Sequence, residues 1–175
     1  MAITRVSASN LSGTSLPSTI TSASGLPLGK IGQVVQTYKT DIFSTSSTSF
    51  VDVTGLSVSI TPSATTSKIL ISLTATIAQG TAGWNLYTQL LRDSTVVGSS
   101  TGGSSGQLFA GSLFAGNAYV ETIAQNYLDS PSTTSEIIFK LQAKVGGSRT
   151  GYFGRRGDAD SEGFPASITA TEVLI

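Results

Sequence analysis

The chain has 175 residues, enough for one domain with a substantial core, and its ten basic and ten acidic residues give a formal net charge of zero. It contains no cysteine and no histidine, so a disulfide framework, a thiol nucleophile and a Ser-His-Asp triad within this chain are excluded. Only 11% of the residues are charged, and the polar surface must come largely from Ser and Thr, which together make up about 30% of the chain. This composition gives no electrostatic reason to expect nucleic acid as a partner. No segment has the ~20 apolar residues needed to insert into a membrane as a helix.

Residues 1–29 are expected to form an extended N-terminal arm and not a packed element. Their apolar residues are sparse and keep no period, and prolines and glycines interrupt them. The arm could be a disordered tail, or it could lie across a partner protein and become ordered there. In the second case the docking residues would be the spaced apolar side chains Ile3, Val6, Leu11, Leu16 and Ile20. The opening sequence MAITRVSASNLSG lacks the apolar core of a signal peptide, so we expect no secretory leader.

From residue 30 onward the sequence alternates with a period of two, which predicts β-strands that are buried on one face. The stretch 68–79 places on one face Ile69, Ile71, Leu73, Ala75 and Ile77. The stretch 136–145 places on one face Ile137, Phe139, Leu141, Ala143 and Val145. Shorter strands are predicted in LSVSI at 56–60, with Leu56, Val58 and Ile60 inward, and in the closing SITATEVLI at 167–175.

The segment WNLYTQLLRD at 84–93 alternates less cleanly, because both of its faces are partly apolar. Such a strand can be buried on both sides, as at a subunit contact. The segment QLFAGSLFAGNAYV at 107–120 is predicted to be an apolar strand or loop, whose phenylalanines belong either to the core or to a subunit interface. The candidate interface residues in these two segments are Trp84, Leu86, Tyr87, Leu91, Phe109 and Phe114.

Turn-forming clusters separate the predicted strands, among them DIFSTSSTS, TPSATTS, GSSTGGSSG, DSPSTTS and RRGDADSEGFP. Pro62, Pro131 and Pro165 fall in such joints, where no strand ladder needs an amide hydrogen. We count eight to ten short strands and no helix. The sequence therefore predicts an all-β fold, an antiparallel β-sandwich or jelly roll over residues 30–175.

RRGDADSE at 155–162 is the most charged stretch and the first place to look for chemistry. Its alternating acids Asp158, Asp160 and Glu162 are weak candidates for a calcium ion, but no EF-hand pattern follows. Paired-carboxylate catalysis is disfavoured, since the neighbouring arginines would lower the pKa of these carboxyls. We expect no catalytic residue, no bound metal and no cofactor. A candidate ligand or receptor surface, for example for a glycan, consists of Tyr152, Phe153, Arg155, Arg156, Asp158 and Asp160.

Two longer segments carry a family resemblance. SFVDVTGLSVSITPSATTSKILISL at 49–73 resembles a segment of bacteriophage virion proteins, especially tail-fibre and fibre-like proteins of aquatic phages. YLDSPSTTSEIIFKLQAK at 127–144 resembles a second segment of the same proteins, a Leu-Asp-Ser-Pro turn followed by a strand. GKIGQVVQTYKTDIFST at 29–45 and the closing strand are also similar, so the resemblance covers roughly residues 30–175.

This resemblance implies a compact antiparallel β domain, similar to a fibre knob, that works as a homotrimer in a phage particle and has no enzymatic activity. The arm would dock the trimer to another virion protein of the capsid or tail, and the trimer would contact the host surface. Only 29 residues precede the domain in this chain, without a fibre shaft, which favours a capsid decoration, cement or head-fibre protein as the alternative. A monomeric carbohydrate-binding module is a further alternative.

Overall fold

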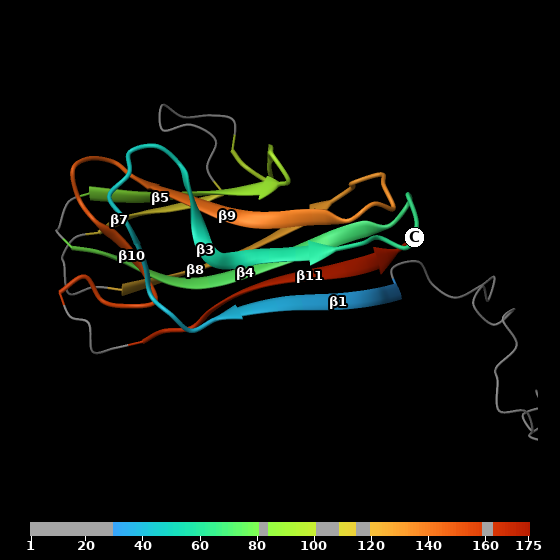
Figure 1. Ribbon diagram of the computed structural model, residues 1–175, viewed down its shortest axis with the longest axis horizontal. Helices are drawn as coiled ribbons and strands as arrows, with labels where there is room; N and C mark the ends of the chain where they lie inside the picture. The colour runs from blue at the N-terminus through green and yellow to red at the C-terminus, as the bar shows by residue number, and fades with distance from the viewer. Residues whose placement is uncertain (1–29, 81–83, 101–108, 115–119, 159–162) are drawn as a thin grey trace, which may run out of the picture.

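The computed structural model describes residues 30–80, 84–100, 109–114, 120–158 and 163–175, which form a β-sandwich of two layers (Figure 1). Eleven strands and no helix occur in these ranges, which confirms the predicted all-β fold. In the same ranges there is accordingly no helix long and apolar enough to cross a membrane.

The first sheet contains four long strands in the spatial order β1, β11, β4 and β8, all antiparallel to their neighbours. Their bounds are Lys30–Lys39 for β1, Ala166–Leu174 for β11, Lys68–Gln79 for β4 and Val120–Asp129 for β8. Two strands of three residues, β10 (Gly151–Phe153) and β2 (Phe43–Thr45), extend this sheet. Because β8 occupies one edge of β4, β10 pairs with the other edge, beyond the end of β11.

The second sheet contains the long strands β3 (Val51–Ile60), β9 (Ile137–Val145) and β5 (Trp84–Arg92), in that order. The far edge of β5 pairs with two shorter strands, β7 (Ala110–Phe114) and β6 (Thr95–Val97). All of these pairs are antiparallel as well. In Figure 1 the layer with β5 and β9 lies above the layer with β11 and β1.

The connections between the sheets give a jelly roll. Along the chain β1, β4, β8 and β11 belong to the first sheet, while β3, β5, β7 and β9 belong to the second. The two spatial orders, β1-β11-β4-β8 and β3-β9-β5-β7, are those of two interlocked Greek keys with long crossings between the layers. This confirms the predicted sandwich and selects the jelly roll within it.

The core lies between the two sheets and consists of the residues that the alternation pointed inward. The five predicted residues of β4 are at most 1% exposed, and the five of β9 are at most 4% exposed. Leu56, Val58 and Ile60 of β3 face them from the second sheet and are also buried. The period-two pattern therefore identified the buried faces of these three strands correctly.

The predicted joints are mostly loops, with one exception. Pro62, Pro131 and Pro165 lie outside the strands, as expected. The cluster DIFSTSSTS was expected to be a turn, but its residues 43–45 form β2. This short strand is held because Phe43 packs edge-to-face against Phe153, with ring centroids 5.9 Å apart, while β2 pairs with β10.

Candidate functional surfaces

The predicted ligand loop follows β10 and is internally paired in its described part. The Arg155 guanidinium lies 4.4 Å from the centroid of the Tyr152 ring, a cation–π contact. Arg155 Nε donates to the carbonyl of Arg156 at 2.8 Å, and Arg156 Nη2 lies 2.9 Å from Asp158 Oδ2. Each of these charged side chains thus has a partner within the loop. This leaves the half-buried Tyr152 as the aromatic side chain of β10 that reaches the surface.

Phe153 was assigned to the same surface, and this assignment is wrong. The residue is 0% exposed and belongs to the hydrophobic core. Along β10 the side chains alternate, so that Tyr152 points outward and Phe153 inward. The candidate surface therefore retains Tyr152, Arg155, Arg156 and Asp158, while Asp160 lies outside the described residues.

Of the three weak candidates for a metal ligand, only Asp158 lies in the part of the chain that the structure describes. No group of three or more His, Cys, Asp or Glu residues is placed there to hold a metal ion. Asp158 forms an ion pair with Arg156 instead. The other two candidates, Asp160 and Glu162, lie outside the described residues, as do the arm residues Ile3, Val6, Leu11, Leu16 and Ile20.

The candidate interface residues of β5 and its neighbourhood separate into two groups. Leu86 is 0% exposed and Phe109 is 8% exposed, and both pack in the core of the single chain. They therefore have little or no surface to offer a neighbouring subunit, which corrects their assignment. Leu91 and Tyr87 point to the outer side of β5. Leu91 is only 7% exposed within one chain and so also offers little surface, whereas Tyr87 is half-buried. The side chains of Trp84 and Phe114 lie outside the described part.

The outer face of the second sheet carries a polar network across three strands, which we call the Asp52 network. Gln89 Nε2 donates to Gln142 Oε1 at 2.6 Å, and Gln142 Nε2 donates to Asp52 Oδ1 at 2.6 Å. Lys140 Nζ lies 2.9 Å from the other oxygen of Asp52. Hydrogen bonds from Lys140 and then Gln142 lower the pKa of Asp52. The polar groups on this face are thus largely satisfied by one another.

The same face continues past this network with an aromatic and cationic cluster. Lys144 Nζ lies 4.6 Å from the centroid of the Phe50 ring and 5.6 Å from that of Tyr87. The ammonium group is therefore held between two rings of the same chain. Together with the Asp52 network, this contact makes the outer face of the second sheet charged and internally bonded.

The outer face of the first sheet is different, because twelve of its residues across the four long strands carry no charge. We call this surface the neutral face. It consists of Val34, Gln36 and Tyr38 of β1; Ser167, Thr169 and Thr171 of β11; Leu70, Ser72 and Thr74 of β4; and Ala124, Asn126 and Leu128 of β8. All twelve are exposed or half-buried, and three apolar members remain strongly exposed: Val34 at 58%, Tyr38 at 61% and Leu128 at 48%.

The strand register arranges the neutral face in rows that cross the sheet. One row is apolar apart from a threonine and consists of Val34, Thr171, Leu70 and Leu128. The next row is polar and consists of Gln36, Thr169, Ser72 and Asn126. Within it Gln36 Nε2 donates to Thr169 Oγ1 at 2.8 Å. The face therefore presents apolar surface and hydrogen-bonding groups side by side.

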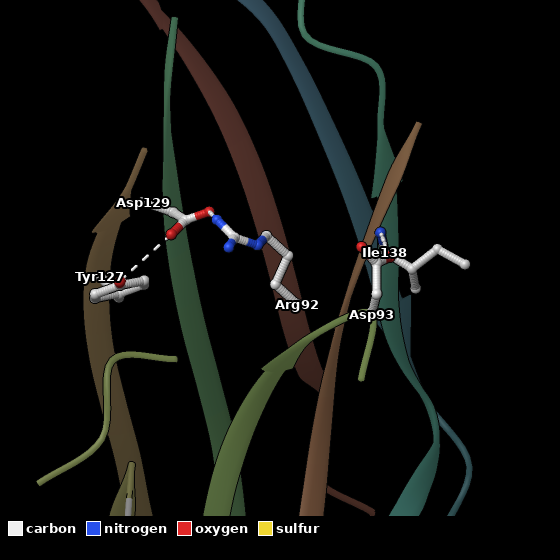
Figure 2. Close-up of polar contacts among 5 residues, drawn as sticks. All are labelled: Arg92, Asp93, Tyr127, Asp129 and Ile138. Carbon is white, nitrogen blue, oxygen red and sulfur yellow. Dashed lines mark hydrogen bonds and ion pairs between the residues drawn. The ribbon is translucent and has the colours of Figure 1, made fainter. Parts of the chain in front are cut away.

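Three acidic residues that were not among the candidate site residues have structural contacts: Asp129, Asp93 and Glu172. Figure 2 shows Asp129, at the end of β8, beside Arg92, at the end of β5. Arg92 Nη1 lies 2.7 Å from Asp129 Oδ2, and Tyr127 donates its hydroxyl hydrogen to Asp129 Oδ1 at 3.4 Å. Burial, followed by the charge of Asp129, raises the pKa of Tyr127. Next to this pair, Asp93 accepts a hydrogen bond from the Ile138 amide at 2.9 Å, which fastens the β5–β6 turn to β9.

The third of these acids is Glu172, which lies on the inward face of β11 and is 1% exposed. Its carboxylate accepts hydrogen bonds from Gln33 Nε2 at 2.9 Å, from the Ser63 amide at 2.6 Å and from the Ser63 hydroxyl at 2.7 Å. Burial alone would raise the pKa of Glu172, but the hydrogen bonds from Gln33 and Ser63 outweigh it and lower the pKa to about 2. A carboxyl held ionised in this way is unsuited to act as a general acid. It fastens the 61–67 turn onto the sheet.

Comparisons with known proteins give a loose structural likeness. No family model matches the sequence, and no curated protein matches it. Among solved structures, the VP2 protein of infectious bursal disease virus in derived T=1 particles is 12% identical, with a TM-score of 0.42 over 82% of this chain and 36% of that one. The structure of the Gx strain of that virus is 14% identical, with a TM-score of 0.39 over 84% of this chain and 38% of that one. This chain spans little more than a third of the length of either protein.

Proposed function

We propose that the protein is a non-enzymatic structural protein of a phage virion, whose jelly-roll domain assembles with further copies of itself. The observation that carries this proposal is the placement of the two segments that resemble phage virion proteins. Residues 49–73 supply β3 and the first half of β4, and residues 127–144 supply the end of β8 and most of β9. In the fold β3 pairs with β9 and β4 pairs with β8, so the two segments lie side by side in both sheets.

The contacts of the carboxylates support a non-enzymatic role. Glu172 and Asp129 are buried and bonded to groups of the same chain, and Asp52 is bonded to Lys140 and Gln142. Carboxylates in such contacts contribute to stability, whereas general acid–base catalysis needs a carboxyl whose pKa lies near the working pH. The absence of histidine and cysteine from the sequence points the same way.

The finer parts of the proposal follow the family resemblance. The assembly is a homotrimer, residues 1–29 dock it to a capsid or tail protein, and the loop after β10 contacts the host surface. The outward position of Tyr152 beside Arg155 suits such a contact, because aromatic rings stack on sugars and arginines bind their hydroxyl groups. Decoration of the head, without host contact, is the alternative within this proposal.

Electron microscopy of phage particles with a gold-labelled antibody against this chain tests the proposal. Label on the tail supports host attachment, and label over the whole head supports decoration. Particles that carry no label, while an antibody against the major capsid protein labels them, would contradict a virion role. Glycan binding by a protein that stays monomeric would favour the carbohydrate-binding module instead.

A further inference from the structure

We infer that copies of this chain associate through the neutral face of the first sheet. This inference rests on the proposed function and deepens it, because it names the surface through which the copies assemble. The sequence alone pointed to β5 and its neighbourhood, on the opposite sheet. We place the interface instead on the outer side of β1, β11, β4 and β8.

The first argument is charge. None of the twelve residues of the neutral face is acidic or basic, although the chain has ten residues of each kind. Lys68 lies on the same side of β4, one row beyond Leu70, at the margin of this face. When the same face of two copies meets, a charged side chain of one copy can lie next to the same charge of the other. Such a like-charge contact costs several kcal/mol when it is buried. The twelve neutral residues avoid this cost over the area that they cover, with Lys68 at its margin. A phosphate-bearing partner would need a cluster of cationic side chains and a divalent cation would need carboxylates, and the twelve residues of the neutral face include neither.

The second argument is the exposed apolar area. Val34 and Leu128 are the two ends of the apolar row, which therefore extends across the full width of the four long strands. Tyr38 is 61% exposed two rows away and gives an aromatic anchor, a residue type that is enriched in interfaces. Side chains of this size are normally covered when they gather on one face, since burial releases roughly 1.5–3 kcal/mol for each.

The third argument is the hydrogen-bonding row between the apolar positions. Gln36, Ser72 and Asn126 offer amide and hydroxyl groups at the surface. An interface core that combines apolar anchors with a few hydrogen bonds gains both affinity and a fixed relative orientation. On the outer face of the second sheet, by contrast, Asp52, Gln89, Lys140 and Gln142 already bond one another in the Asp52 network, and Lys144 contacts Phe50 and Tyr87.

The experiment measures the mass of the full chain by light scattering, for the wild type and for three variants. Val34→Glu and Leu128→Glu place a charge at either end of the apolar row. Ile138→Glu is the matched control, because Ile138 is 40% exposed on the outer face of the second sheet. We expect a wild-type mass at a multiple of 17.9 kDa, a dissociation constant raised at least about 30-fold by each neutral-face variant, and no change for Ile138→Glu.

A second measurement keeps the test valid if a glutamate variant fails to fold. The chain has no cysteine, so Asn126→Cys and Ser59→Cys each introduce a single thiol, on the neutral face and on the outer face of the second sheet respectively. We expect maleimide labelling of the first thiol to slow as the protein concentration rises, in step with the mass, while labelling of the second stays constant.

Three outcomes would overturn the inference. The first is a wild-type chain that stays monomeric at the highest concentration. The second is dissociation by Ile138→Glu but not by the neutral-face variants, which would place the interface on the opposite sheet. The third is slow labelling of Asn126→Cys at every concentration, which would mean that the chain covers this face itself. If the chain is a monomer but is found in phage particles, only the interface is contradicted. If it is an oligomer but is absent from phage particles, only the virion role is contradicted.

Discussion

Arg92 and Asp129 connect the two sheets of the jelly roll through an ion pair of 2.7 Å (Figure 2). Arg92 ends β5 in the second sheet, and Asp129 ends β8 in the first. The Asp129 side chain is 5% exposed and the Arg92 side chain 27% exposed, so water screens this pair much less than a surface pair. The family resemblance drew attention to the Leu-Asp-Ser-Pro turn, and the structure gives its aspartate a role that holds the layers together.

Removing the cation should therefore destabilise the fold strongly. Arg92→Met leaves the Asp129 carboxylate buried without its counter-charge, and we expect a loss of about 2–4 kcal/mol in the free energy of unfolding. The additional change Asp129→Asn removes the stranded charge and should restore part of this loss. Urea denaturation followed by circular dichroism gives both values.

The ion pair of Lys140 with Asp52 supplies the control, because its side chains are 29% and 54% exposed. Lys140→Met should cost less than about 1 kcal/mol, as is usual for exposed pairs. Equal losses for Arg92→Met and Lys140→Met would contradict the account of Asp129 as a buried link between the sheets.

Glu172 predicts how stability depends on pH. Its pKa is about 2 in the folded protein, below the ordinary value of 4.5, so the folded state binds its proton less readily than the unfolded state. The resulting stabilisation is complete above about pH 5 and is lost as the pH falls toward 2, with a maximum of about 3 kcal/mol. Glu172→Gln should be less stable at pH 7, and its difference from the wild type should disappear near pH 2.

Thermal melts of both proteins between pH 7 and pH 2 measure this difference. Ser63→Ala is a graded test, since it removes the hydroxyl donor but keeps the amide donor of the same residue. We expect this variant to lose part of the pH-dependent stability. If Glu172→Gln and the wild type gave parallel curves down to pH 2, folding would not lower the pKa of Glu172.

Much of the fold was predictable because the long strands carry their period in the sequence. β4 and β9 each have five apolar residues in strict alternation, and this fixes both the strand and its buried face. β2, β6 and β10 have three residues each, which is too short to show a period. This is why eight to ten strands were expected where the structure describes eleven.

The surfaces were less predictable, because they depend on which strands become neighbours. In the triplet of β10, no pattern decides whether Tyr152 or Phe153 points inward, and the choice follows from the pairing of Phe153 with Ile77 of β4. The neutral face joins four strands that are scattered along the chain, so no window of the sequence contains it. The buried position of Glu172 could have been found in the sequence. It follows Ile168 and Ala170 at the alternate positions of β11 that point inward.

Gly98 should tolerate no side chain, for two independent reasons. Its φ is +64°, a conformation that L-residues rarely adopt, and a Cβ would lie 2.8 Å from Cγ of Tyr127. Gly98→Ala therefore combines backbone strain with a clash against a ring next to the Arg92–Asp129 pair, and we expect a loss of about 2–4 kcal/mol in urea denaturation. Gly163→Ala is the control, because a Cβ there would meet nothing within 4 Å. If Gly163→Ala lowered the free energy of unfolding as much as Gly98→Ala, the cost at Gly98 would not come from its φ angle and the Tyr127 ring.

The last prediction separates core from surface within β10. Phe153→Ala empties a site that is 0% exposed and packs against Phe43, so it should cost about 3–5 kcal/mol in the free energy of unfolding. Tyr152→Ala removes a half-buried ring that contacts Arg155, and we expect a cost near 1 kcal/mol. Urea denaturation measures both, and a larger loss for Tyr152→Ala would mean that Tyr152, and not Phe153, points into the core.

Because Tyr152→Ala should remain folded, adsorption of phage carrying it to host cells then tests the loop as a contact surface. Unchanged adsorption would remove Tyr152 from that surface and favour decoration of the head over host attachment.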